Sequence, residues 1–137
     1  MRPEIIPGLR RLTDAIHAEG AAAGIQLGHC GNMSHKSICG CMPVGASSGF
    51  NLYSPTFVRG LRADELPEMA RAYGRSVNLA REAGFDSVEI HAGHGYLISQ
   101  FLSPSTNHRK DEFGGSLQNR MRFMLSLIHI SEPTRQE

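Results

Sequence analysis

The segment His91-Ala92-Gly93-His94-Gly95-Tyr96 is the densest group of chemically capable side chains in this 137-residue sequence. Two imidazoles and a phenol stand within six residues, separated by small residues that leave the backbone free to turn. Two ring N–H groups can bind one carbonyl oxygen and stabilise the negative charge that develops there. A phenol keeps its proton at neutral pH and can donate it as a general acid. This combination is typical of a carbonyl-activating reductase, and because no side chain supplies a hydride, it predicts a bound cofactor.

A second polar group lies near the end of an apolar stretch, in Ile25-Gln26-Leu27-Gly28-His29. The amide of Gln26 would suit the edge of a heterocycle such as a flavin, although a core glutamine bonded to backbone is an equal alternative. His29 is the obvious third ligand if His91 and His94 hold zinc, which leaves a metal-dependent hydrolase as an alternative function.

The composition indicates a globular protein of the cytoplasm. Hydrophobic residues make up 40% of the chain, charged residues 20%, and the net charge is +1, so neither disorder nor nucleic-acid binding is expected. No apolar run is long enough for a membrane span, and the start lacks a signal peptide. Three cysteines crowd one segment, an odd count that favours reduced thiols, and Cys39-Gly40-Cys41 lacks the usual spacing of structural zinc sites.

Helices and strands are expected to alternate along the chain. Apolar spacing and stop signals predict helices over residues 7–20, 64–84 and from 116 onward, and short buried strands over residues 21–27 and 87–91. Asp64 is the expected N-cap of the second helix, and Pro67 falls in its first turn.

This alternation predicts an α/β fold with parallel strands. The links that follow the strands, residues 28–63 and 92–115, are long and hold the reactive side chains. They leave the carboxyl ends of the strands, where α/β barrels and open α/β sheets build their sites. The Gly-x-Gly-x-x-Gly signature of a nucleotide-binding open sheet is absent after both strands, which favours the barrel.

Several segments together resemble the signature of the old yellow enzyme relatives, also called NADH:flavin oxidoreductases. They are the run from Val88 to Leu97, then Gln100-Phe101-Leu102-Ser103-Pro104, Asn107, Arg109, and Asp111 through Ser116 to Asn119-Arg120. Ile25 to Gly31 resembles the family's earlier strand motif, and the resemblance covers roughly residues 7–124.

The resemblance implies a (β/α)8 TIM barrel that binds FMN, takes a hydride from NADH or NADPH, and reduces the alkene of a small α,β-unsaturated carbonyl compound. It implies that His91 and His94 bind the substrate oxygen, that Tyr96 donates a proton or contacts substrate, and that Gln26 bonds the flavin ring. The full-length protein that contains this segment could also form homo-oligomers.

The resemblance also implies that the chain is an incomplete piece of such a barrel, about strands 3 and 4 with flanking helices. Residues 1–124 are the expected partial barrel domain, and residues 125–137 resemble translated sequencing-adapter read-through, a non-native tail. An ordinary helix end broken before Pro133 is the alternative. A truncated segment of this kind would be inactive by itself, because the loops that complete a barrel site are missing.

Overall fold

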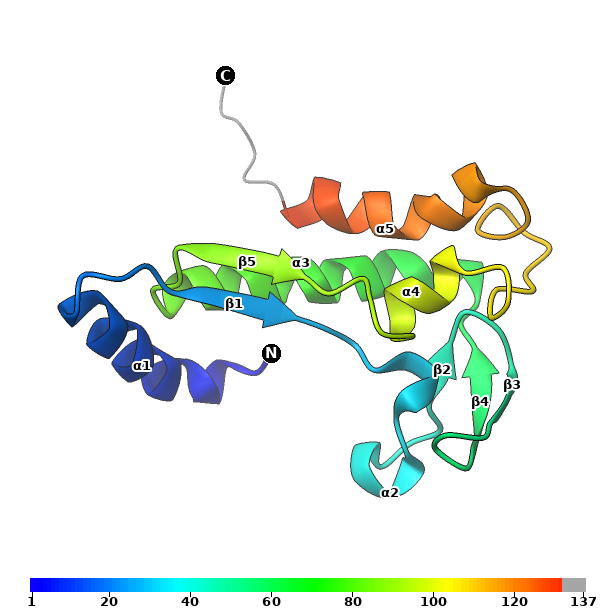
Figure 1. Cartoon of the computed structure of the whole chain (residues 1–137), viewed down its shortest axis with the longest axis horizontal. Coiled ribbons are helices and arrows are strands. Elements are labelled where there is room, and N and C mark those ends of the chain that lie inside the picture. Colours follow the sequence, from blue (N-terminus) through cyan, green and yellow to red (C-terminus); the bar gives the residue numbers. More distant parts are fainter. Residues whose placement is uncertain (132–137) are drawn as a thin grey trace.

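The structure, a computed structural model, describes residues 1–131. Its alternating framework comprises α1 (Ile6–Ala18), β1 (Gly24–Leu27), α3 (Leu66–Glu82), β5 (Ser87–Ile90) and α5 (Leu117–Ser131). An insertion between β1 and α3 contains α2 (Lys36–Cys39), β2 (Val44–Gly45), β3 (Gly49–Asn51) and β4 (Thr56–Gly60), and α4 (Leu97–Leu102) follows β5. Short 3₁₀ turns lie at Pro3–Ile5, Gly31–Met33 and Ala63–Glu65. Figure 1 shows β1 and β5 side by side, with the insertion beyond the carboxyl end of β1.

The strands β1 and β5 pair in parallel, with Gly24 opposite Ser87 and Leu27 opposite Ile90. Because side chains alternate along a strand, each strand sends one set to each face of this sheet. On one face, four apolar side chains pack against the core that includes α3. They are Ile25, Leu27, Val88 and Ile90. The opposite face carries Gln26 and Glu89 and is exposed. This second face leads directly to the reactive segment after β5.

The hydrophobic core lies between α3, α4 and α5 (Figure 1). The rings of Phe101 and Phe123 lie 4.7 Å apart at its centre, and both side chains are fully buried. Burying aromatic side chains of this size stabilises the docking of α5 on α4 by the hydrophobic effect. The helix α4 is thereby held firmly at the point where the reactive segment ends.

Helix α5 runs across the predicted domain boundary at residue 124. It continues to Ser131, and Leu127 packs into the core without exposure to solvent. The remaining part of the predicted tail, residues 132–137, lies outside the described residues. A non-native origin of residues 125–137 stays a prediction.

The expected helices, strands and parallel pairing are confirmed, but the two strands are not buried as expected, since the face that carries Gln26 and Glu89 is exposed. The link from residue 28 to 63 is also more structured than expected. In it β4 pairs in parallel with β2 and antiparallel with β3, forming a small sheet of its own. Hydrophobic alternation does not reveal β2 and β3, which are two and three residues long, and β4 is defined by its pairing with them. Within residues 1–131, no helix has the length and apolar character that crossing a bilayer requires.

Asp64 is not an N-cap, as the sequence had suggested, because Ala63–Glu65 form a 3₁₀ turn that leads into α3. The carboxylate of Glu65 instead accepts a hydrogen bond from the Arg62 backbone N–H at 2.8 Å. It also accepts two from the Arg59 guanidinium, at 2.7 and 3.0 Å. Glu65 therefore ties β4 of the insertion to the start of α3.

We expect Glu65 to make the stability of the protein sensitive to acid. The hydrogen bonds from Arg59, and then that from the Arg62 backbone, lower the pKa of Glu65 to about 2 from an ordinary value of 4.5. Because the folded pKa is depressed, this stabilisation is present above about pH 4.5 and is lost as the pH falls toward about 2. Urea unfolding measured across this pH range should show that the unfolding free energy of Glu65→Gln falls less steeply with decreasing pH than that of the unchanged protein. Glu82→Gln, an exposed change at the other end of α3, is the matched control, and equal slopes in both variants would contradict the prediction.

Candidate functional site

The structure brings together the three aromatic side chains that follow β5. Nε2 of His91 lies 3.3 Å from Nδ1 of His94, and the two rings stack with centroids 5.1 Å apart. The ring of Tyr96 meets His91 edge to face, with centroids 5.2 Å apart. The sequence-predicted group is therefore one compact cluster at the carboxyl end of a strand.

A tight backbone turn produces this clustering. His94 has φ 56° and Gly95 has φ 70°, so two successive residues adopt the left-handed conformation. Glycine adopts it freely, whereas a histidine there is strained and needs support from its surroundings. The Tyr96 N–H donates to the Gly93 carbonyl at 3.2 Å, and α4 starts at Leu97. The turn thus points His94 and Tyr96 back toward His91.

The geometry of the two imidazoles suits the binding of one oxygen atom. His91 is half-buried and His94 is exposed, so a ligand can reach both rings. An oxygen about 3 Å from His91 Nε2 and His94 Nδ1 could accept two hydrogen bonds in place of the contact between the rings. His91 would then carry its proton on Nε2 and His94 on Nδ1, because the bound ligand favours the tautomers that donate to it.

Gln26 extends the polar surface along the strand face. Its amide Nε2 donates to Glu89 Oε1 at 2.8 Å, as their paired register positions require. Gly28 directly follows β1, and an added Cβ there would lie 3.5 Å from the Cβ of His91. The surface from Gln26 to His91 is therefore continuous and polar, and at Gly28 no side chain rises from it. The role of Gln26 toward a flavin stays a prediction.

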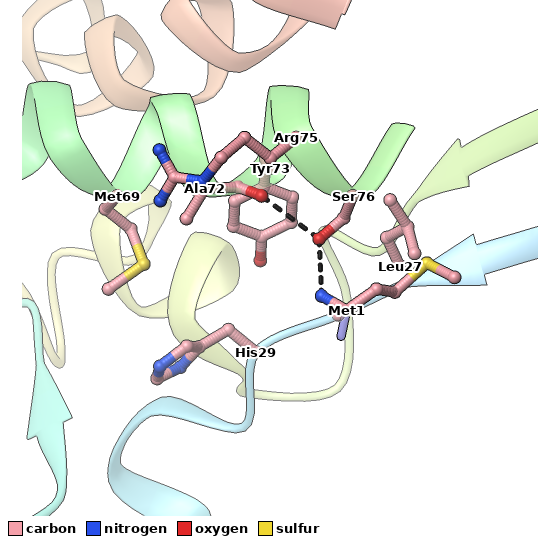
Figure 2. A pocket seen from close by; sticks show the side chains of 9 residues that line it. Met1, Leu27, His29, Met69, Ala72, Tyr73, Arg75 and Ser76 are labelled. Atoms are coloured by element: carbon pink, nitrogen blue, oxygen red, sulfur yellow. Dashed lines mark hydrogen bonds between the residues drawn. The ribbon is translucent and has the colours of Figure 1, made fainter. Parts of the chain in front are cut away.

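His29 does not join the other two histidines. It lines a cavity of about 280 Å³ beside α3, together with Met69 and Tyr73, as Figure 2 shows. Its Nδ1 accepts from the Gly31 N–H at 2.9 Å, so the proton of the neutral ring lies on Nε2, and burial lowers the pKa of His29. Among residues 1–131 no three His, Cys, Asp or Glu side chains are grouped to hold a metal ion. The three-histidine zinc site considered from the sequence therefore has no support in this arrangement.

Tyr73 faces the same cavity and was expected only as an apolar helix position. Its hydroxyl is buried and has no hydrogen-bond partner among the described residues. Burial, and to a lesser degree the charge of a Cys30 thiolate, raises the pKa of Tyr73 to about 12. A tyrosine within an apolar stripe gives no sequence signal of an unpaired hydroxyl, because it packs as well as phenylalanine.

Arg109 fastens the insertion to the segment after α4, a role that the sequence motif alone did not reveal. Its guanidinium, with the side chain only 7% exposed, donates to the carbonyls of Ala46, at 2.9 Å, and Leu61. It lies over the Phe101 ring at 5.4 Å and pairs with Asp111 at 2.5 Å. The hydrogen bond from Arg109 lowers the pKa of Asp111. These charge-assisted hydrogen bonds join the insertion, at Ala46 and Leu61, to the segment after α4.

Comparison with known proteins identifies relatives of this chain. A family model described as the NADH:flavin oxidoreductase / NADH oxidase family matches residues 2–131. The NADPH dehydrogenase of Bacillus subtilis (strain 168) is 41% identical over 125 residues, which are 91% of this chain and 36% of that protein. Across three of the curated relatives, the chain spans 32% to 41% of their length.

Solved structures agree with the sequence match. The old yellow enzyme homologue from Zymomonas mobilis is 36% identical and superimposes with a TM-score of 0.87, covering 92% of this chain and 38% of that one. Morphinone reductase in complex with tetrahydroNAD is 34% identical with a TM-score of 0.88, covering 92% and 39%. The fold is therefore α/β and corresponds to part of a TIM barrel of this type. The chain belongs to the NADH:flavin oxidoreductase / NADH oxidase family, the family of old yellow enzyme.

Proposed function

We propose that this chain is a segment of a flavin-dependent NAD(P)H oxidoreductase that reduces the alkene of small α,β-unsaturated carbonyl compounds. The observation that carries the proposal is the convergence of His91, His94 and Tyr96 at the end of the polar strand face. Family membership supports the redox chemistry, because this family uses FMN with NADH or NADPH.

The residues of the exposed strand face fit a bound flavin ring. The amide of Gln26 can hydrogen-bond the polar edge of the heterocycle, and glycine at position 28 leaves the surface beside His91 free of a side chain. Bound FMN, reduced by NADH or NADPH, would supply the hydride that no side chain of this chain can provide. Gln26 is proposed to hold the ring, and His91 and His94 to stand beside it.

The three aromatic side chains are proposed to divide the work on the substrate. His91 and His94 donate hydrogen bonds to the carbonyl oxygen and stabilise the negative charge that grows there as the β carbon is reduced. Tyr96 transfers its phenolic proton to the α carbon, and the resulting phenolate then takes a proton from solvent. The substrate alkene gains one hydride and one proton, and becomes a saturated carbonyl compound.

The rest of the barrel is proposed to lie in sequence beyond this chain. Two paired strands cannot close a barrel, and the relatives are more than twice as long as the part matched here. We assign residues 1–124 to the barrel segment and propose that residues 125–137 are a non-native tail. Sequencing the complete reading frame tests this assignment, because a different sequence should then follow residue 124.

The whole protein provides the test of function. Purified from its complete reading frame, it should be yellow and contain about one flavin per chain. Under anaerobic conditions NADPH or NADH should bleach the flavin, and 2-cyclohexenone should restore its colour. A colourless protein without flavin, or a reduced flavin that the enone leaves unchanged, would contradict the proposal.

A further inference from the structure

Gln100 is a buried polar side chain outside the group that contacts substrate in the proposed reaction. It lies on α4, and only 1% of its surface is exposed. Its amide Nε2 donates to the Gly95 carbonyl at 2.6 Å and to Asn32 Oδ1 at 2.8 Å, with the Cys30 carbonyl at 3.5 Å. Its Oε1 accepts from the Asn32 backbone N–H at 3.2 Å. One amide therefore bridges the loop after β1 and the loop after β5.

The contact with Gly95 acts on the strained part of the site. Gly95 stands between His94 and Tyr96, and both Gly95 and His94 are left-handed. A strained backbone conformation persists only where surrounding contacts hold it. The hydrogen bond from Gln100 holds the carbonyl of the peptide that joins Gly95 to Tyr96, directly after the left-handed residues His94 and Gly95, so it helps to fix the directions in which the His94 and Tyr96 side chains leave the turn.

The loop after β1 is built around the same amide. Gly31 has φ 60°, and an added Cβ there would lie 2.5 Å from Nε2 of Gln100. Beyond Gly31, the Asn32 carbonyl accepts from Asn51 Nδ2 on β3 at 2.6 Å. A chain of hydrogen bonds thus runs from the small sheet of the insertion through Asn32 and Gln100 to the turn with His94 and Tyr96.

We propose that Gln100 is a positioning residue that sets the geometry of His94 and Tyr96 toward the substrate and couples it to the insertion. This inference rests on the proposed function. A displacement of reacting groups by about 1 Å can lower a rate by about a hundredfold. Loss of the amide is therefore expected to affect the enone reaction far more than reduction of the flavin by the nicotinamide.

The test uses the whole flavin-loaded protein with Gln100→Met, which keeps the length of the side chain and removes both N–H donors. We expect kcat/KM for 2-cyclohexenone to fall by about tenfold to a hundredfold, with flavin reduction by NADPH within about twofold of wild type. Thr106→Val is the matched control. It deletes a side-chain hydrogen bond to the Gln100 backbone carbonyl, 2.9 Å long, without touching the amide, and should leave both reactions unchanged.

Asn32→Ala gives a second measurement if Gln100→Met does not fold. It removes one acceptor of the amide and leaves the core intact, so a loss of about threefold in enone kcat/KM is expected, with flavin reduction unaffected. Unchanged enone kinetics in the folded variant, or equal losses in both half-reactions, would overturn the inference. If the wild-type protein binds no flavin or does not reduce the enone, the proposed function is wrong. This result is seen before any variant is measured, so it can be told apart from a failure of the inference about Gln100.

Discussion

Replacing Tyr96 by phenylalanine in the whole flavoprotein is expected to slow reduction of 2-cyclohexenone by about a hundredfold. The change removes only the phenolic oxygen, and a positioned general acid contributes about 10²- to 10⁴-fold to a rate. Packing of the ring against His91, with centroids 5.2 Å apart, is retained. Reduction of the flavin by NADPH needs no proton from this group, so its rate should stay within about twofold of wild type. Stopped-flow measurement of the two half-reactions separates these effects.

Tyr53→Phe is the matched control for Tyr96→Phe. Tyr53 lies in the turn between β3 and β4 and is 90% exposed, so deleting its hydroxyl should change neither half-reaction. If Tyr96→Phe slowed both half-reactions equally, Tyr96 would not be the proton donor. The enone reaction at the wild-type rate would contradict the role as well.

Replacing His94 by alanine is expected to lower kcat/KM for the enone by about 10²- to 10³-fold. Removal of one donor to a developing oxyanion has this effect in enzymes that stabilise such a charge. The partner ring of His91, 3.3 Å away through Nε2, cannot restore the second hydrogen bond. Steady-state kinetics with 2-cyclohexenone measure the loss, and flavin content shows that the cofactor is still bound.

The backbone of His94 supplies a sharper comparison. Asparagine tolerates the left-handed conformation found there, φ 56°, and its amide offers an N–H donor. We therefore expect His94→Asn to retain kcat/KM within about tenfold of wild type, and His108→Ala, an exposed histidine away from the cluster, to have no effect. Equal losses in His94→Ala and His94→Asn would contradict a hydrogen-bonding role for His94.

The framework of the fold could be predicted from the sequence because its elements are long or strongly patterned. The apolar stripe of α3 and the strands β1 and β5 give clear periodic signals, and their order predicts parallel pairing. The small sheet of β2, β3 and β4 could not be predicted, because β2 and β3 have only two and three residues and the sheet depends on tertiary contacts. Arg109 provides such contacts by holding the carbonyls of Ala46 and Leu61.

For the candidate site, the sequence predicted the grouping of the aromatic cluster but not its surroundings. Closeness in sequence was enough to place His91, His94 and Tyr96 together, whereas His29 follows a different strand and turns toward α3. Gln100 belongs to the segment that resembles the family signature, but the sequence did not reveal its structural role. Two of its partners, the Cys30 carbonyl and Asn32, are about 70 residues away and are brought near only by the three-dimensional fold.

The most direct measurement is a crystal structure of the whole flavoprotein with a phenol bound as a mimic of the substrate carbonyl. We expect the phenol oxygen to lie within about 3.2 Å of a ring nitrogen of both His91 and His94. We also expect the flavin ring to lie against the strand face that carries Gln26. Imidazoles that turn away from the ligand, or a flavin bound elsewhere, would contradict the assignment of this cluster as the substrate site.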